Sequence, residues 1–191
     1  QDSIYIQAYL SSLRFAAIAT ALLALIGYPI AYGISRFGEK SRQFLILAVI
    51  LPFFTSFLIR IYAWMIILGP QAALARGVNG VLAALGLEPV SLLFSSFAVL
   101  ACLVYVHLPF MVLPLYANLE KHDQALLDAA QDLGASAWQR FWRITFPLSL
   151  PGVYAGAALV FIPALGMFAI PDILGGPEDS LIGNVIKQQF L

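Results

Sequence analysis

The sequence Asp128-Ala129-Ala130-Gln131-Asp132-Leu133-Gly134, followed after nine intervening residues by Ile144-Thr145-Phe146-Pro147, decides how this chain is interpreted. It belongs to the longest polar interruption in a chain of 191 residues that is 61% hydrophobic and 10% charged. A membrane protein has little reason to place such a compact unit between two spans unless another protein docks on it. We therefore expect a partner to bind here.

Charged residues are too few for a soluble domain, in which they make up about a quarter of the chain. Five stretches contain no Lys, Arg, Asp or Glu, namely 15–35, 43–59, 61–75, 89–106 and 144–171. A helix needs about 20 apolar residues to cross a bilayer. The sequence therefore predicts an all-α integral membrane protein, with residues 1–191 forming one transmembrane domain.

Four spans are expected, at about residues 12–35, 43–69, 92–118 and 152–174. Each contains proline, which membrane helices tolerate when neighbouring groups satisfy the freed carbonyls. Kinked helices around a cavity and ordinary membrane-helix composition both explain these prolines. Short interfacial helices are expected at about residues 78–85 and 180–191.

Lys and Arg are unevenly distributed between the two sides of these spans. One side carries six of them, Arg36, Lys40, Arg42, Lys121, Arg140 and Arg143. The other side carries three, Arg14, Arg76 and Lys187. The positive-inside rule therefore places loops 36–42 and 119–147 in the cytoplasm and both visible ends outside. Because no signal peptide precedes the first span, we expect a further helix upstream.

Other function classes find little support in the sequence. The formal net charge is zero, which does not suggest nucleic-acid binding. The single cysteine, Cys102, lies within a span and indicates a small packed side chain. We find no zinc-type spacing, phosphate loop or nucleophile elbow, so no catalytic residue, metal site or bound cofactor is expected. The energy for any transport must come from another subunit.

The polar unit is predicted to contain two short helices. Asp123 is well placed to cap the first, since Asp accepts hydrogen bonds from free backbone amides. Its apolar stripe comprises Leu126, Leu127, Ala130 and Leu133, and Gly134 is the natural stop. Ser136 is expected to cap the second helix, which Pro147 and Pro151 should end. The alternative is an amphipathic helix lying on the membrane surface.

A few polar and aromatic residues are candidates for a transport pathway. Arg60 lies inside a span, where a charge usually faces the bundle interior or a water-filled cavity, although it could also snorkel to the headgroups. Asp172 could attract a cation, or pair with Arg60, cap a helix or meet outside water. Aromatic faces attract cations, and Tyr62, Trp64 and Phe168 could supply them. His107 is interpreted as a hydrogen-bonded residue of the span.

The spacing from Asp128-Ala129-Ala130 through Gly134 to Ile144-Thr145-Phe146-Pro147 resembles the EAA loop of ABC importer permeases. The family pattern is Glu-Ala-Ala, three residues, Gly, nine residues, Ile-x-Leu-Pro, so Asp128 stands for Glu and Phe146 for Leu. Residues 51–62, 108–116 and 181–190 are similar to the spermidine/putrescine importer permeases, most of all the first permease of the spermidine-preferring system. That similarity implies the type I importer permease fold, with one further helix at each end.

The resemblance also implies partners and roles. A second, distinct permease subunit would complete the pathway in the bacterial inner membrane, and a periplasmic binding protein would deliver the substrate. Two cytoplasmic ATPase subunits, which would bind ATP and Mg²⁺, would each receive one coupling helix. In this chain that helix would be residues 124–133, supported by Ile144 and Pro147.

Three alternatives remain open from the sequence. The same machine could move another solute, such as an opine, an aminophosphonate or ferric iron, because the binding protein sets much of the specificity. An ion-coupled secondary transporter would need intramembrane acidic residues, and the expected spans contain only Asp172, near an edge. An intramembrane enzyme would need a catalytic partner for His107 within its span.

Overall fold

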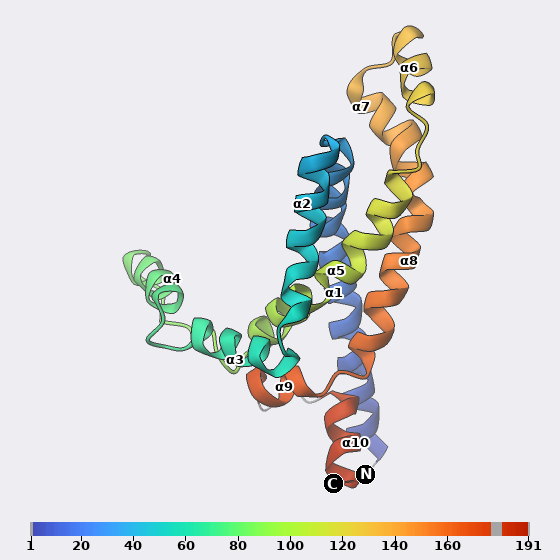
Figure 1. The fold of residues 1–191 in the computed structure, drawn as a ribbon. Helices are drawn as coiled ribbons and strands as arrows, with labels where there is room; N and C mark the ends of the chain where they lie inside the picture. The colour runs from blue at the N-terminus through green and yellow to red at the C-terminus, as the bar shows by residue number, and fades with distance from the viewer. Residues whose placement is uncertain (1, 177–180, 191) are drawn as a thin grey trace. The chain divides into compact units, whose positions relative to one another are not determined.

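The computed structural model describes residues 2–176 and 181–190, and these residues form helices and connecting turns without any strand (Figure 1). Within these ranges, four helical segments are long and apolar enough to cross a membrane. They are Tyr5–Arg36, Phe57–Ala84, Ser96–Leu119 and Ala137–Leu165. The prediction of an all-α membrane protein with four spans is confirmed.

The chain divides into two compact units. The first contains Pro52–Val106, together with the residues up to Ala19 and those from Phe161 onward. The second contains Thr20–Leu51 and His107–Val160. Each unit has its own buried cluster of apolar side chains.

The second unit contains the polar segment that includes Asp128, Gly134 and Pro147. Its elements are the later part of α1 (Asp2–Arg36), α2 (Glu39–Ile50), the later part of α5 (Ser96–Leu119), α6 (Gln124–Asp132), α7 (Ala137–Arg140), a π-helical turn (Phe141–Thr145) and most of α8 (Phe146–Leu165). In this unit α6 and α7 lie beyond the end of α5 and the start of α8 (Figure 1).

The core of the second unit lies between α1 and α5. Its buried residues are Ala31, Ile34, Val112, Leu115, Tyr116 and Leu119. Three residues of α2, Leu45, Ile46 and Val49, pack against this cluster with helical spacing. On the rest of α2, Phe44 and Leu47 are exposed, as expected for a helix with an apolar surface that faces lipid.

Two glycines allow α8 to lie directly on α5. A Cβ atom at Gly156 would lie 2.7 Å from Met111 Sδ and 3.1 Å from Met111 O. A Cβ atom at Gly152 would lie 3.1 Å from Leu115 Cα. Gly152 and Gly156 are four residues apart, the small-xxx-small spacing that lets membrane helices approach closely. Larger residues would therefore push these helices apart.

The first unit is built from shorter pieces. They are the beginning of α1, a 3₁₀ turn (Leu51–Phe54), α3 (Phe57–Leu68), α4 (Ala73–Ala84), the beginning of α5, the end of α8, α9 (Ala169–Leu174) and α10 (Ile182–Phe190). Its core includes Phe15, Ile61, Leu68, Val99, Leu103, Ile170, Leu174 and Leu181. The beginning of α10 is tied to α1, because the Ile182 amide donates a hydrogen bond of 2.8 Å to Ser12 Oγ.

The expected second span, residues 43–69, is not one helix. Helix α2 ends at Ile50, and Pro52 lies in the 3₁₀ turn before α3 begins at Phe57. Proline lacks an amide hydrogen, and its ring clashes with the carbonyl four residues before it. The break therefore falls at Pro52, whereas Arg60 lies within α3 and does not interrupt it.

The expected fourth span, residues 152–174, is also displaced. Helix α8 starts at Phe146 and ends at Leu165, and α9 is a separate short helix. The prediction that Pro147 and Pro151 end the preceding helix is wrong. The Phe146 amide bonds to Phe141 O, five residues back, so the wider π-helical turn makes room for the ring of Pro147.

The two interfacial helices were predicted from residues 78–85 and 180–191. The first corresponds to α4, which begins at Ala73 and ends at Ala84 and belongs to the candidate span Phe57–Ala84, so its interfacial position stays a prediction. The second corresponds to α10, and residues 180 and 191 lie outside the described part of the chain.

Candidate functional site

Helix α6 begins where the sequence predicts. The Asp123 carboxylate accepts a hydrogen bond of 2.9 Å from the Ala125 amide and so caps the helix. Such a cap satisfies one of the amides that lack a partner within the helix. The predicted cap is confirmed, and it fixes the first turn of a helix that is too short to be stable alone.

Gly134 ends α6 and reverses the chain. Its φ angle is +82°, in the left-handed region that favours glycine. The Gly134 amide donates to Gln131 O at 2.8 Å, and the Ala135 amide donates to Ala130 O at 2.9 Å. This pair of bonds is the Schellman motif, which satisfies the last carbonyls of the helix. The predicted stop is confirmed.

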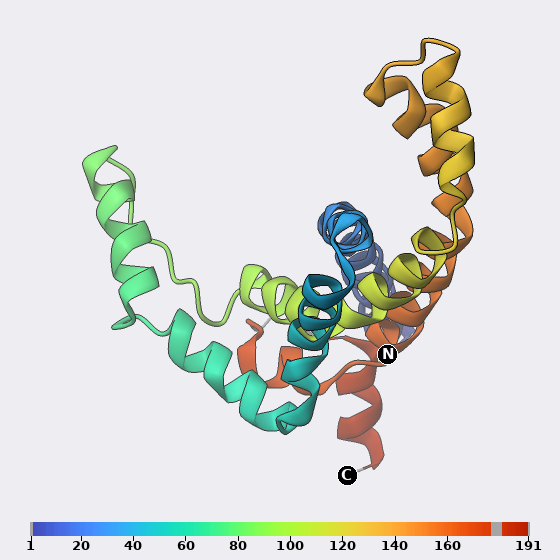
Figure 2. The ribbon, with the colours of Figure 1, turned by 45° about the horizontal axis from the view of Figure 1, so that its top comes forward.

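Helix α7 starts three residues after Gly134, at Ala137, with a reciprocal cap. The Gln139 amide donates to Ser136 Oγ at 3.3 Å, and the Ser136 amide donates to Gln139 Oε1 at 2.9 Å. This capping box ties both ends of the first turn of α7 to side chains. Figure 2 shows α6 and α7 as a pair joined by a tight turn.

The apolar stripe of α6 divides between two faces. Leu127 is 8% exposed and Ala130 is half-buried, so these two residues face the protein. Leu126 is 49% exposed, Leu133 is 89% exposed, and Ala129 is also exposed. The spacing 126, 129 and 133 places the exposed three on one side of the helix. The predicted stripe is therefore buried along only one edge, and α6 presents a free apolar face.

Polar side chains hold α6 in place. Arg140 Nη1 donates to Gln131 Oε1 at 2.7 Å and so links α7 to α6. Arg36, at the end of α1, lies with Nη1 3.5 Å from Gln124 Oε1. The Arg36 guanidinium also lies 4.9 Å from the centre of the Tyr32 ring. The helix is thus tied to the ends of two other helices.

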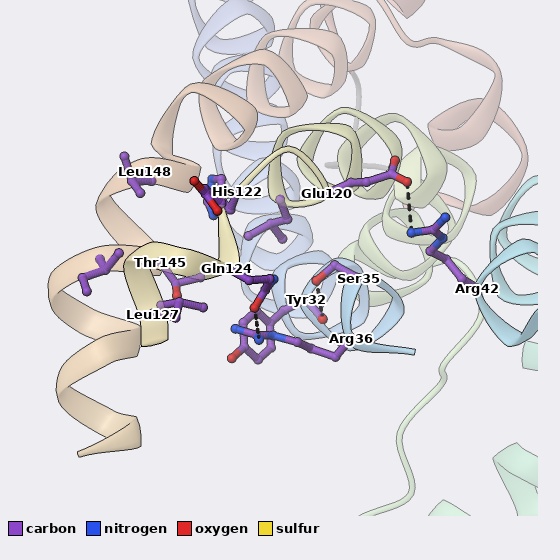
Figure 3. A pocket seen from close by; sticks show the side chains of 13 residues that line it. Tyr32, Ser35, Arg36, Arg42, Glu120, His122, Gln124, Leu127, Thr145 and Leu148 are labelled. Atoms are coloured by element: carbon purple, nitrogen blue, oxygen red, sulfur yellow. Dashed lines mark hydrogen bonds and ion pairs between the residues drawn. The ribbon is translucent and has the colours of Figure 1, made fainter. Parts of the chain in front are cut away.

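A pocket of about 190 Å³ is lined by the ends of α1 and α5, by α6 and by the start of α8 (Figure 3). Its lining includes Tyr32, Glu120, His122, Leu127 and Thr145. At one edge the Arg42 guanidinium pairs with the Glu120 carboxylate at 3.1 Å. Both signs of charge are present, so the pocket does not define a site for one kind of ion.

Aromatic rings connect the turn after α7 to α1. Phe141 lies edge-on to both Tyr28 and Tyr32, with ring centres 5.8 Å and 5.5 Å apart. The Ser149 hydroxyl donates a hydrogen bond to Phe146 O. The Tyr28 hydroxyl, 2.8 Å from Ser149 Oγ, is therefore the donor in the bond between these two side chains. Movement of the α7 segment would therefore be passed to α1 and α8 through packed side chains.

The remaining predicted coupling residues lie on α6 and in the segment that follows α7. Asp128 is exposed on α6, Ile144 is half-buried in the π-helical turn, and Pro147 is exposed at the start of α8. The structure thus brings the helix, its turn and the Ile-x-x-Pro segment together in one unit.

The predicted pathway residues Asp172 and Phe168 meet two residues that the sequence did not single out. The Asp172 carboxylate pairs with the Lys187 ammonium and not with Arg60. Asn184 Nδ2 donates to Asp172 Oδ1 and to Phe168 O, each at 3.1 Å. The sequence alone marks Lys187 only as a charge on the outer side. Its position four residues after Gly183, one helical turn, is the signal that could have identified it.

The charge of Asp172 follows from these neighbours. Asp172 lies outside the four candidate spans. The hydrogen bond from Lys187 holds the pKa of the Asp172 carboxyl below its usual value, partial burial opposes this, and the Asn184 amide adds to the lowering. Asp172 is therefore an anion at neutral pH.

The other three pathway candidates lie on α3. Arg60 is buried, and its guanidinium lies 5.2 Å from the centre of the Phe53 ring and 5.8 Å from that of Phe57. Trp64 packs edge-on against Tyr105 at 5.8 Å. Tyr62 is 49% exposed. Neither Tyr62 nor Trp64 is brought to Asp172 by a contact that the structure shows.

Comparison with known proteins identifies relatives of the whole chain. Residues 24–190 match the family described as the binding-protein-dependent transport system inner membrane component. The chain is 46% identical to the spermidine/putrescine transport system permease protein PotB of Haemophilus influenzae, and it covers 66% of that protein. It is also 46% identical to PotB of Escherichia coli strain K12, covering 68% of it. Each alignment covers 100% of this chain.

The fold also matches a solved transporter. A crystal structure of a bacterial alginate ABC transporter, in complex with a periplasmic protein that carries an alginate pentasaccharide, has a chain of similar fold with a TM-score of 0.70. That chain is 22% identical, and the match covers 96% of this chain and 66% of the other. The similarity supports the arrangement of helices and says nothing of the solute.

Proposed function

Since this chain belongs to the family of inner membrane components of binding-protein-dependent transport systems, we propose that it is the permease subunit of an ATP-driven importer of spermidine and putrescine. The proposal treats residues 1–191 as one transmembrane permease domain. The chain spans 66% of the length of a relative that carries this function in its name.

The observation that carries the proposal is the free apolar face of α6. Leu126, Ala129 and Leu133 are exposed on a helix with capped ends. Fully burying a leucine side chain contributes about 1.5–3 kcal/mol, so such a face favours a protein partner. The EAA-like spacing of this segment supports an ATPase subunit as that partner.

The proposed mechanism needs no covalent chemistry in this chain. Two ATPase subunits bind ATP and Mg²⁺, and each receives one coupling helix, here α6 with its Gly134 turn. Closure of the ATPase pair moves α6, and the contacts of Phe141 with Tyr28, Tyr32 and Phe146 carry that motion to α1 and α8. The spans then change between inward-open and outward-open states, whose populations the ligands shift.

The remaining partners follow from the same proposal. A second permease subunit, distinct from this one, completes the pathway, and a periplasmic binding protein delivers the solute. The excess of Lys and Arg supports a cytoplasmic position for α6 and for loops 36–42 and 119–147. The visible ends of the chain then face the periplasm.

A polyamine is the solute that the relatives and the local chemistry favour. The name of the relative from Haemophilus influenzae includes spermidine and putrescine. Asp172 supplies a carboxylate and Phe168 an exposed ring within the first unit, and both groups attract ammonium ions.

The test is ATP-dependent uptake of labelled spermidine by the complete importer in proteoliposomes. The importer contains the full-length protein, the second permease, the ATPase and the binding protein. Gly134→Asp places a side chain on a left-handed backbone position in the proposed coupling turn. Gly86→Asp is the matched control, because Gly86 is also exposed and has a φ angle of +73°.

We expect Gly134→Asp to abolish uptake in a complex that still contains all subunits, while Gly86→Asp imports spermidine. Uptake that survives Gly134→Asp would contradict the coupling role. An assembled wild-type complex that hydrolyses ATP but imports no spermidine would contradict the solute.

A further inference from the structure

One lysine of this chain already lies where a cationic solute would bind. The Lys187 ammonium pairs with Asp172 Oδ2 and lies 5.8 Å from the centre of the Phe168 ring. A carboxylate beside an aromatic face is the pair of groups that attracts a primary ammonium. Lys187 therefore makes the contacts that the end of a polyamine chain would seek.

The protein positions this lysine through two neighbours on α10. A Cβ atom at Gly183 would lie 2.8 Å from Gly166 O and 3.0 Å from Phe168 Cβ, so only glycine allows α10 to come this close. Lys187 follows one helical turn later on the same side of α10. Asn184 is 5% exposed and joins α10 to Phe168 O and to Asp172.

The charged groups remain accessible. The side chains of Asp172 and Lys187 are each 38% exposed, and Phe168 is exposed as well. An ion pair at such a position contributes little to stability, with a typical value of about 0–1 kcal/mol. A second ammonium group can therefore compete with Lys187 for the carboxylate.

We propose that Lys187 is a tethered competitor that occupies an ammonium-binding site formed by Asp172 and Phe168 until a polyamine displaces it. The inference rests on the proposed polyamine import. One carboxylate balances one ammonium, so the solute binds only when Lys187 swings away. In the empty protein the Lys187 ammonium keeps the site neutral. While the solute is bound, the displaced Lys187 competes with it for the Asp172 carboxylate, which favours departure of the solute.

Removing the competing charge should then tighten apparent binding. In Lys187→Met the KM for the spermidine-loaded binding protein should fall about two- to fivefold, the range that corresponds to a weak exposed ion pair. Lys187→Arg keeps a cation on the site and should leave the KM within twofold of wild type. Asp172→Asn should raise the KM, and in the presence of this change Lys187→Met should have no further effect.

The experiment measures initial rates of spermidine uptake by the complete importer over a range of loaded binding-protein concentrations. The variants are Lys187→Met, Lys187→Gln, Lys187→Arg, Asp172→Asn and the Lys187→Met/Asp172→Asn pair. Arg76→Met on α4 is the control for removal of an exposed cation. ATPase activity stimulated by the binding protein is recorded in parallel, because it reports assembly without requiring that the solute be translocated.

A lower KM in both neutral variants, restored in Lys187→Arg and absent in the double variant, supports the proposal. The proposal is overturned if uptake by the wild type is normal and the neutral variants only lower the maximal rate, or fail to assemble, since the pair is then structural. If the wild-type ATPase responds to the binding protein but no spermidine enters, the proposed function itself fails.

Discussion

Arg140 Nη1 donates a hydrogen bond of 2.7 Å to Gln131 Oε1, and this bond joins the two short helices on either side of the Gly134 turn. The two residues are nine positions apart, and the left-handed glycine brings them together. The bond makes α6 and α7 one unit, which can transmit a push on α6 to the π-helical turn and α8.

Loss of this bond should loosen α6 without unfolding the protein. A hydrogen bond typically contributes about 0.5–1.5 kcal/mol, and an exposed one lies at the lower end. In Gln131→Ala and in Arg140→Ala, the amides of α6 should therefore exchange hydrogen about two- to fivefold faster. The double variant should resemble either single one. Arg143→Ala is the control, and unchanged exchange in Gln131→Ala would contradict the prediction.

Leu133 should matter for the ATPase and not for folding. Its side chain is 89% exposed, so Leu133→Asp costs little in the isolated subunit. Loss of its burial in a complex should weaken ATPase binding at least tenfold, measured as the amount of ATPase that copurifies at increasing dilution. Leu87→Asp, at another exposed leucine, should leave binding unchanged. Equal effects of the two changes would show that Leu133 has no special role.

Truncation of Met111 should distinguish a glycine that contacts only side chains from one that also contacts backbone. A Cβ atom at Gly27 would meet side-chain atoms, with Met111 Cγ nearest at 2.9 Å, whereas one at Gly156 would also meet Met111 O at 3.1 Å. In a Met111→Ala background, Gly27→Ala should therefore cost almost nothing. Gly156→Ala should still destabilise by about 1–3 kcal/mol, which lowers the apparent Tm.

Gly33→Ala is the control for this series, because nothing lies within 4 Å of a Cβ atom at that position. Alanine has the higher helix propensity, so this variant should be at least as stable as wild type. If Met111→Ala relieved both glycine substitutions equally, the backbone contact at Gly156 would not be limiting.

Arg60 should stabilise α3 rather than contact the solute. Its guanidinium lies over the Phe53 and Phe57 rings, and a desolvated cation–π contact contributes about 2 kcal/mol. Arg60→Met should lower the apparent Tm of the complex and leave the KM for spermidine within twofold. A KM that rises severalfold with an unchanged Tm would place Arg60 in the pathway.

The coupling unit could be predicted from sequence because its signals are local. Asp123, Gly134 and Ser136 each act on amides or carbonyls within a few residues, so their spacing is sufficient. The split of the α6 stripe was not predictable in this way. Leu127 and Leu126 are equally apolar, and only the position of α6 against the rest of its unit decides which of them is buried.

The limits of the spans were predicted less well, again for physical reasons. Pro52 and Pro147 are both prolines in apolar sequence, yet one breaks the chain into two helices and the other lies within a continuous one. The difference comes from the π-helical turn before Pro147, which no local sequence pattern predicted. The pairing of Asp172 with Lys187 was missed because it joins residues of two helices whose relative placement depends on Gly183.

The most direct test of the coupling role is a cross-link from α6 to the ATPase. Cys102 is the only cysteine in the sequence, so Cys102→Ala provides a background for Ala129→Cys on the exposed face of α6. In the assembled, uptake-competent importer, the cysteine at position 129 should cross-link to the ATPase, and one at Leu87 should not. Absence of any ATPase product from position 129 in a complex that still imports spermidine would contradict the account.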